Sequence, residues 1–294
     1  MRFLFLAALV ATTFTACSTG KTVDGADSDV DTDSTTDQGA GDTDVTDTDT
    51  GGVDDTDVAV PPYTGGQYKV TELRVLSADH GGDLDGDGTP DNQIAVLLAA
   101  IDSALGPGIY NLPTVNARID EMLFTERAIV LLDVDNDAGA VTFDALQGGR
   151  DLAFNLIVLP SSYDVNGDPK SRMLGEMKDP DTFSVGPAPL TIPVQFYADE
   201  PVIEISAVQA YIFGDITADT VDGSIAAAVT TTAIMEGVVK PLIESEFGLS
   251  SSYGQQFLGV AQYLVDQNAD LTIDGEPALS AAFSFKAEDV LWTR

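Results

Sequence analysis

Apolar and polar residues alternate along several stretches of the chain, as they do in strands that bury one face of a sheet. Residues 190–197 give the clearest case, and residues 68–76 and 279–285 repeat the pattern. Pro193 has no amide proton for a ladder hydrogen bond, so we place strand 190–197 at a sheet edge. Further apolar runs of strand length occupy residues 129–134, 153–159 and 203–213.

Helical periodicity is clearest in residues 94–105, where five apolar residues recur at intervals of three and four. Gly106-Pro107-Gly108 follows and predicts the end of this helix. Shorter or less regular patterns predict further helices at residues 115–122, 225–239 and 257–264. The segment 225–239 is apolar on nearly every side, which is typical of a buried helix.

Strands and helices mixed in this way predict an α+β fold. We expect mainly antiparallel, β-sandwich-like sheets with three or four helices. About 230 residues remain after the N-terminal segments described below, enough for one domain with a proper core. We therefore expect a single folded, β-rich domain over residues 63–294.

The first residues have the composition of an export signal. Arg2 precedes an apolar run at residues 3–14, which is too short to cross a bilayer because a spanning helix needs about 20 residues. The following Phe14-Thr15-Ala16-Cys17 resembles the lipobox of bacterial lipoproteins, with Phe14 where an aliphatic residue is usual. The resemblance implies cleavage of a signal peptide, residues 1–16, and lipidation of Cys17. Ser18, rather than Asp, then favours the outer membrane, with the domain facing the periplasm or the cell surface.

Residues 17–62 are rich in Asp and Thr and contain no aromatic residue. Such a segment buries too little apolar surface to offset the entropy of ordering it, so we expect a disordered tether. As a flexible coil it would span about 35–40 Å. Lipid on Cys17 would anchor this tether to the membrane.

Net charge excludes one class of partner. The whole chain carries a formal charge of −35, and residues 61–294 alone hold 35 acidic and 11 basic residues, or −24. A surface this acidic repels nucleic acid and attracts cations. Cys17 is the single cysteine, so no disulfide forms within the chain.

The strongest candidate site is the segment Asp83-Leu84-Asp85-Gly86-Asp87-Gly88-Thr89-Pro90-Asp91. Carboxylates at alternate positions of a tight loop converge, and hard oxygen ligands suit Ca²⁺. The predicted ligands are Asp83, Asp85, Asp87, the Thr89 carbonyl and Asp91.

The segment resembles the calcium loops of thrombospondin type 3 repeats and, more distantly, those of EF-hands and dockerins. The full loop would cover residues 83–94, but Ile94 occupies the last position, where those loops usually carry an acid. Asp79 and Asp102 are the nearby candidates for the remaining carboxylate. Weaker acidic patterns occur at residues 133–137, 164–169 and 266–270.

No catalytic constellation is evident. His80 is the only histidine, and neither an HExxH zinc motif nor a G-x-S-x-G nucleophile motif is present. We therefore expect a tethered lipoprotein with a calcium-stabilised binding or structural domain, whose protein or glycan ligand stays open. The alternatives are an extracellular polymer hydrolase with structural calcium and a catalytic carboxylate pair, and an envelope carrier of an apolar ligand.

Overall fold

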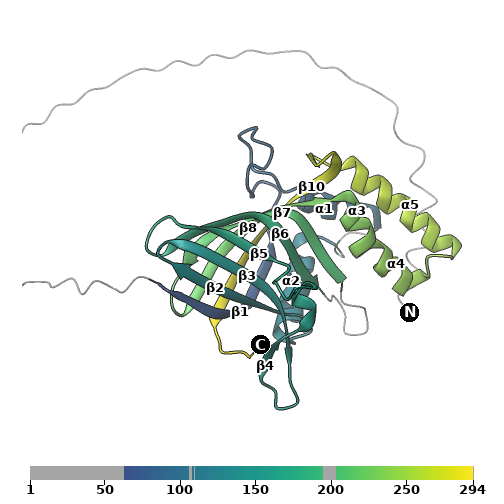
Figure 1. Cartoon of the computed structure of the whole chain (residues 1–294). Helices are drawn as coiled ribbons and strands as arrows, with labels where there is room; N and C mark the ends of the chain where they lie inside the picture. The colour runs from purple at the N-terminus through teal and green to yellow at the C-terminus, as the bar shows by residue number, and fades with distance from the viewer. Residues whose placement is uncertain (1–62, 106–107, 109, 195–202, 294) are drawn as a thin grey trace, which may run out of the picture. The chain divides into compact units, whose positions relative to one another are not determined.

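One antiparallel sheet that closes on itself forms the centre of the fold (Figure 1). The computed structural model describes residues 63–105, 108, 110–194 and 203–293. The predicted signal peptide, Cys17 and the tether lie outside the described residues. The described part falls within one compact unit, residues 62–294.

Eight strands make up the closed sheet. They are β1 (Gly65–Val75), β2 (Ile129–Asp137), β3 (Ala140–Arg150), β5 (Arg172–Met177), β6 (Thr182–Val194), β7 (Ile203–Ile216), β8 (Thr220–Thr230) and β10 (Glu276–Asp289). Two short strands pair at the side, β4 (Leu156–Val158) with β3 and β9 (Leu271–Ile273) with β10. The first and last strands, β1 and β10, pair over seven residue pairs and close a barrel.

The expectation of mainly antiparallel β structure is confirmed, whereas the sandwich-like arrangement is wrong. A sandwich and a barrel both require strands that bury one face, so both produce the same alternation along the sequence. The pairing of β1 with β10 decides between them, because it joins the two edges that a sandwich would leave free.

Large side chains fill the inside of the barrel. In β2, Val130, Leu132 and Val134 belong to the main core, whereas Ile129 and Leu131 belong to a second cluster on the outer wall. Further inside, the rings of Phe143 and Phe183 stack at a centroid distance of 5.7 Å, and both are fully buried. The interior is therefore mostly packed core, as expected for a barrel of eight strands.

Within the described residues, four helical segments accompany the barrel, which agrees with the predicted three or four. They are α1 (Gln93–Leu105), α2 (Leu112–Phe124), a continuous segment formed by α3 (Thr231–Ile234), a π-turn (Met235–Val239) and α4 (Lys240–Phe247), and α5 (Ser252–Gln267). A 3-10 turn (Pro160–Ser162) follows β4. Among the described residues, no helix is long and apolar enough to cross a membrane.

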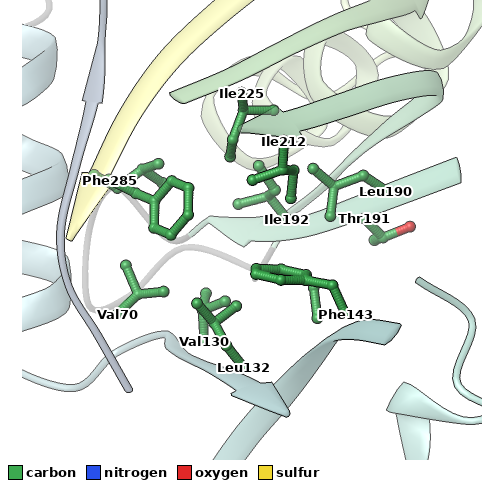
Figure 2. A pocket seen from close by; sticks show the side chains of 12 residues that line it. Val70, Val130, Leu132, Phe143, Leu190, Thr191, Ile192, Ile212, Ile225 and Phe285 are labelled. Atoms are coloured by element: carbon green, nitrogen blue, oxygen red, sulfur yellow. The ribbon is translucent and has the colours of Figure 1, made fainter. Parts of the chain in front are cut away.

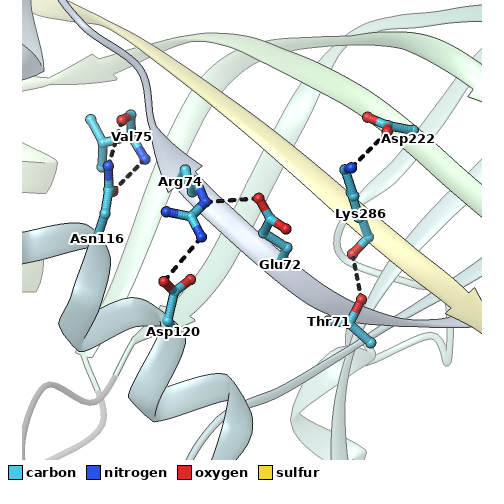
Figure 3. Close-up of polar contacts among 8 residues, drawn as sticks. All are labelled: Thr71, Glu72, Arg74, Val75, Asn116, Asp120, Asp222 and Lys286. Atoms are coloured by element: carbon cyan, nitrogen blue, oxygen red, sulfur yellow. Dashed lines mark hydrogen bonds and ion pairs between the residues drawn. The ribbon is translucent and has the colours of Figure 1, made fainter. Parts of the chain in front are cut away.

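Helix α2 lies against β1. From Val70 onward, β1 still pairs with β10 but no longer pairs with β2. Figure 3 shows the polar contacts that hold the helix there. The Asn116 side chain accepts a hydrogen bond from the Val75 amide at 2.9 Å and donates one to the Val75 carbonyl at 3.0 Å. Beside it, Arg74 pairs with Asp120 at 3.1 Å. The buried face of α2 joins the core of the barrel.

The predicted helix over residues 225–239 is wrong in its first half. Residues up to Thr230 belong to β8, and the helix begins at Thr231 with the Thr230 hydroxyl accepting from the Ala233 amide. This part of β8 is buried on both faces, since Ala227 and Val229 face the main core and Ala228 packs in a small outer cluster. A strand buried on both faces shows no alternation, so periodicity alone could not separate it from a buried helix.

Candidate metal site

The acidic loop connects β1 to α1, and its base is fixed to the outside of the barrel. Leu76 donates its amide to the Ala282 carbonyl of β10 at 3.0 Å. The buried Asn92 side chain accepts from the Ala282 amide at 3.1 Å and donates to the Leu76 carbonyl at 2.7 Å. Since Asn92 directly precedes α1, these bonds hold both ends of the loop at one place on β10.

Two glycines form the neck of the loop. Gly82 accepts a hydrogen bond from the Asp91 amide at 3.0 Å, which closes the loop between them. A Cβ on Gly81 would lie 2.2 Å from the Asp91 carbonyl oxygen, and one on Gly82 would lie 2.7 Å from the Cβ of Ala226. Beyond the neck, Leu84 packs against the small outer cluster of Ala228, Leu271 and Ala278. The absence of a side chain at Gly81 therefore lets the two ends of the loop approach each other, and its absence at Gly82 lets the loop lie directly on the barrel wall.

Above the neck, three carboxylates converge. Asp83, Asp85 and Asp91 each offer an oxygen atom, and these atoms lie within 4.8 Å of one another. Asp83 and Asp85 are exposed, and Asp91 is half-buried. Among the residues that the structure describes, no other group of three His, Cys, Asp or Glu side chains meets the same criterion.

Backbone amides hold all three carboxylates in place, and that of Asp85 accepts from the Asp87 amide at 3.0 Å. The Asp83 carboxylate accepts from the amides of Gly86 at 2.7 Å and Gly88 at 3.0 Å. Both glycines have a left-handed backbone, with φ of +81° and +88°, which bends the chain around Asp83. From the far end of the loop, Asp91 accepts from the Leu84 amide at 2.9 Å. The loop thus turns its acidic side chains inward.

The other two predicted ligands are arranged differently. The Asp87 carboxylate accepts from the Thr89 amide at 2.8 Å and from the Thr89 hydroxyl. These hydrogen bonds, that of the hydroxyl first, lower the pKa of Asp87. Asp87 does not belong to the group of three, so the structure brings together three of the four predicted aspartates.

Neither nearby candidate for the remaining carboxylate belongs to the group of three. Asp102 accepts from the Gly108 amide at 2.9 Å and the Tyr110 amide at 2.8 Å, which places it at the far end of α1. Asp79 contacts the exposed His80 at 3.0 Å, and hydrogen bonds from Ser77 and His80 lower its pKa.

Two of the three weaker acidic patterns have structural roles. The Asp164 carboxylate accepts from the amides of Asn166 at 2.8 Å and Asp168 at 2.9 Å and so closes a turn. Asp270 accepts from the amide and the hydroxyl of Ser280, which joins it to β10. The third pattern, residues 133–137, lies within β2 and its end.

Two hollows bear on the alternative functions. The first lies inside the barrel and has a volume of about 30 Å³ (Figure 2). Eleven of its twelve lining residues are apolar, among them Phe143 and Phe285, and Thr191 is the twelfth. This volume holds one or two water molecules, far below the roughly 300 Å³ of a small-molecule site.

The second hollow, of about 610 Å³, lies on the outer wall over β1, β2, β3 and β5. Asp133 and Asp144 are directly paired across β2 and β3 and line it together with Arg172. Arg172 donates to both carboxylate oxygens of Asp144, each at 2.8 Å, and Asp144 is only 3% exposed. Asp144 is therefore held in a two-pronged ion pair.

Comparison with known proteins adds no assignment, because no protein-family model, no curated protein and no solved structure matches this chain.

Proposed function

We propose that this protein is an envelope-tethered lipoprotein whose barrel domain is stabilised by Ca²⁺ in the loop of residues 83–91 and acts as a binding or structural module without catalysis. The observation that supports the metal site is the convergence of Asp83, Asp85 and Asp91 on a loop with a fixed base.

The spacing of the three carboxylates suits a calcium ion. Two oxygens bound to one Ca²⁺ at about 2.4 Å are at most about 4.8 Å apart, and the three side chains meet this limit. Without a cation, two charges at this separation repel by about 1–3 kcal/mol at effective dielectric constants between those of water and a protein surface. A divalent ion replaces this repulsion with attraction.

Asp87 and Thr89 would complete the ligand set in this proposal. The exposed Asp87 carboxylate would have to exchange its hydrogen bonds with Thr89 for the ion. The Thr89 carbonyl would supply a backbone oxygen, and water would fill the place left by the apolar Ile94.

Thermal unfolding of the full chain with Ca²⁺ and with a chelator tests the metal site. At a calcium concentration 100 times the dissociation constant, binding adds about 2.7 kcal/mol. For a domain of this size we expect the midpoint to rise by about 5–10 °C.

The double variant Asp83→Asn, Asp85→Asn should lose this rise. Asp164→Asn, Asp168→Asn removes the same charge from another acidic turn and should keep it. Equal midpoints with and without calcium in the unaltered chain, together with no heat of binding in calorimetry, would refute the proposal.

The anchor has its own test. Cells that express the full chain are fed an alkyne-bearing fatty acid, and the protein is isolated and probed for the label. We expect labelling that disappears in Cys17→Ser, the variant that removes the only thiol. Labelling that persists in the variant would refute lipidation at this residue.

The geometry favours neither alternative function. A carrier of an apolar ligand needs a cavity about ten times larger than the one inside the barrel. In the outer hollow, Asp133 and Asp144 do not form the pair that a hydrolase needs, because both oxygens of Asp144 are held by Arg172.

A further inference from the structure

A short loop between β3 and β4 lies at one end of the barrel (Figure 1), and it carries bulky apolar side chains that are exposed to solvent. Leu152 is fully exposed and Phe154 is 77% exposed. Phe124, at the end of α2, is 89% exposed. The contacts of Arg150, given below, bring the end of α2 to this loop. We call these three side chains the apolar tip.

Hydrogen bonds within the loop fix its shape. The Asp151 carboxylate accepts from the amides of Ala153 at 2.8 Å and Asn155 at 2.9 Å. Phe154 donates its amide to the Asp151 carbonyl at 3.0 Å, and its own carbonyl accepts from Arg150 at 2.6 Å. The amides of Ala153, Phe154 and Asn155 and the carbonyl of Phe154 are therefore paired within the protein, and an apolar environment demands such pairing.

The backbone of Phe154 is strained. Its φ of +64° lies in the left-handed region, which bulky residues rarely adopt. Asn155 and Asp151, which bond to each other at 3.0 Å through carbonyl and amide, hold the turn in this conformation. The strained turn directs an aromatic ring outward instead of into the adjacent outer-wall cluster.

Charge around the tip is balanced, in contrast to the rest of the protein. Glu126 pairs with both Lys69 and Arg150, and Arg127 pairs with Glu121 at 3.0 Å. With Asp151, this neighbourhood holds three basic and three acidic residues, whereas residues 61–294 carry −24. A phosphate-bearing surface therefore repels this neighbourhood less than it would repel a surface with the net negative charge of the whole domain.

We propose that the apolar tip docks on a phospholipid bilayer, with Leu152, Phe154 and Phe124 in the interface and Arg150 and Lys69 at the level of the headgroups. A bilayer fits better than a protein partner because the loop projects from the barrel, has no polar side chain between Leu152 and Phe154, and pairs most of its own amides. Basic side chains behind an apolar edge match the order of groups in a membrane interface, where the headgroups lie outside the acyl chains. The proposal depends on neither the calcium site nor lipidation of Cys17.

A single fluorescent label tests it. Cys17 is the only cysteine, so the full chain with Cys17→Ser and Leu152→Cys takes an environment-sensitive dye at position 152 alone. The matched control carries the dye at Val165, an equally exposed residue on the turn of Asp164–Asp168. The vesicles consist of phosphatidylcholine and phosphatidylethanolamine.

We expect vesicles to shift the emission of the dye at position 152 to shorter wavelength. Lipids that carry a spin label near the headgroup should quench this emission. The emission of the dye at position 165 should stay unchanged. Phe154→Ser with Phe124→Ser in the labelled chain should weaken vesicle binding about tenfold or more, since each replaces a large apolar side chain. Vesicle binding through residues 1–16 would not distinguish the two label positions. An unchanged signal at position 152, or equal changes at both positions, would overturn the proposal.

Discussion

Glu126 links three parts of the chain, and its neutralisation should lower stability in a pH-dependent way. One carboxylate oxygen accepts from Lys69 of β1 at 2.6 Å and from Arg150 of β3 at 2.5 Å, and the other accepts from Arg150 at 2.5 Å. The bonds from Arg150, followed by the bond and charge of Lys69, lower the pKa of Glu126 from 4.5 to about 2.

The lowered pKa of Glu126 sets the size of the stability loss that we expect when this side chain is neutralised. A shift from 4.5 to about 2 corresponds to roughly 3 kcal/mol of linked stability. The side chain is 27% exposed, so screening by solvent reduces the expected effect to about 1–2 kcal/mol. Because the folded-state pKa is the lower one, this stability is fully present above pH 4.5 and is lost as the pH falls toward 2.

Denaturant titrations of the full chain and of Glu126→Gln at pH 7, 4.5 and 3 measure this effect. We expect the variant to be less stable by about 1–2 kcal/mol at pH 7 and the difference to shrink toward pH 3. Glu288→Gln makes the same change of charge at an exposed strand position and should cost less than about 0.5 kcal/mol. A difference for Glu126→Gln that stays constant across this pH range would refute the ion-pair reasoning.

Two further predictions concern the barrel. Phe143→Ala removes a fully buried ring stacked on Phe183 and should cost about 3–5 kcal/mol in denaturant titrations, and a loss below 1 kcal/mol would mean that the interior is loosely packed. Gly175→Ala should cost about 3 kcal/mol in thermal unfolding, because its Cβ would lie 2.0 Å from the Ser184 carbonyl oxygen. Gly139→Ala, with φ of +97° and open space around it, should cost about 1 kcal/mol, and the reverse ranking would contradict this account.

Local elements of the fold could be predicted where one face is buried and the other is solvated. Helix α1 covers the predicted residues 94–105, and the alternation at 279–285 lies within β10. Closure of the barrel could not be predicted, because it depends on β1 meeting β10 across more than 200 residues of sequence. The second half of β8 escaped prediction since it is buried on both faces.

The spacing of residues in the sequence also predicted part of the candidate site. Alternate aspartates and two glycines with positive φ are local features, and they predicted that Asp83, Asp85 and Asp91 approach one another. The hydroxyl of Thr89 competes for Asp87, a side-chain contact that spacing does not reveal. The seating of the loop depends on small residues of β8 and β10, far away in the sequence.

Joining β1 to β10 has a consequence for biosynthesis. Strand β1 can pair with β2 early, but it acquires its second neighbour, β10, only after the last strand has left the ribosome, so the cylinder cannot be completed before then. Contacts between such distant segments also form slowly. An incomplete chain therefore leaves one edge of β1 unpaired from Val70 onward.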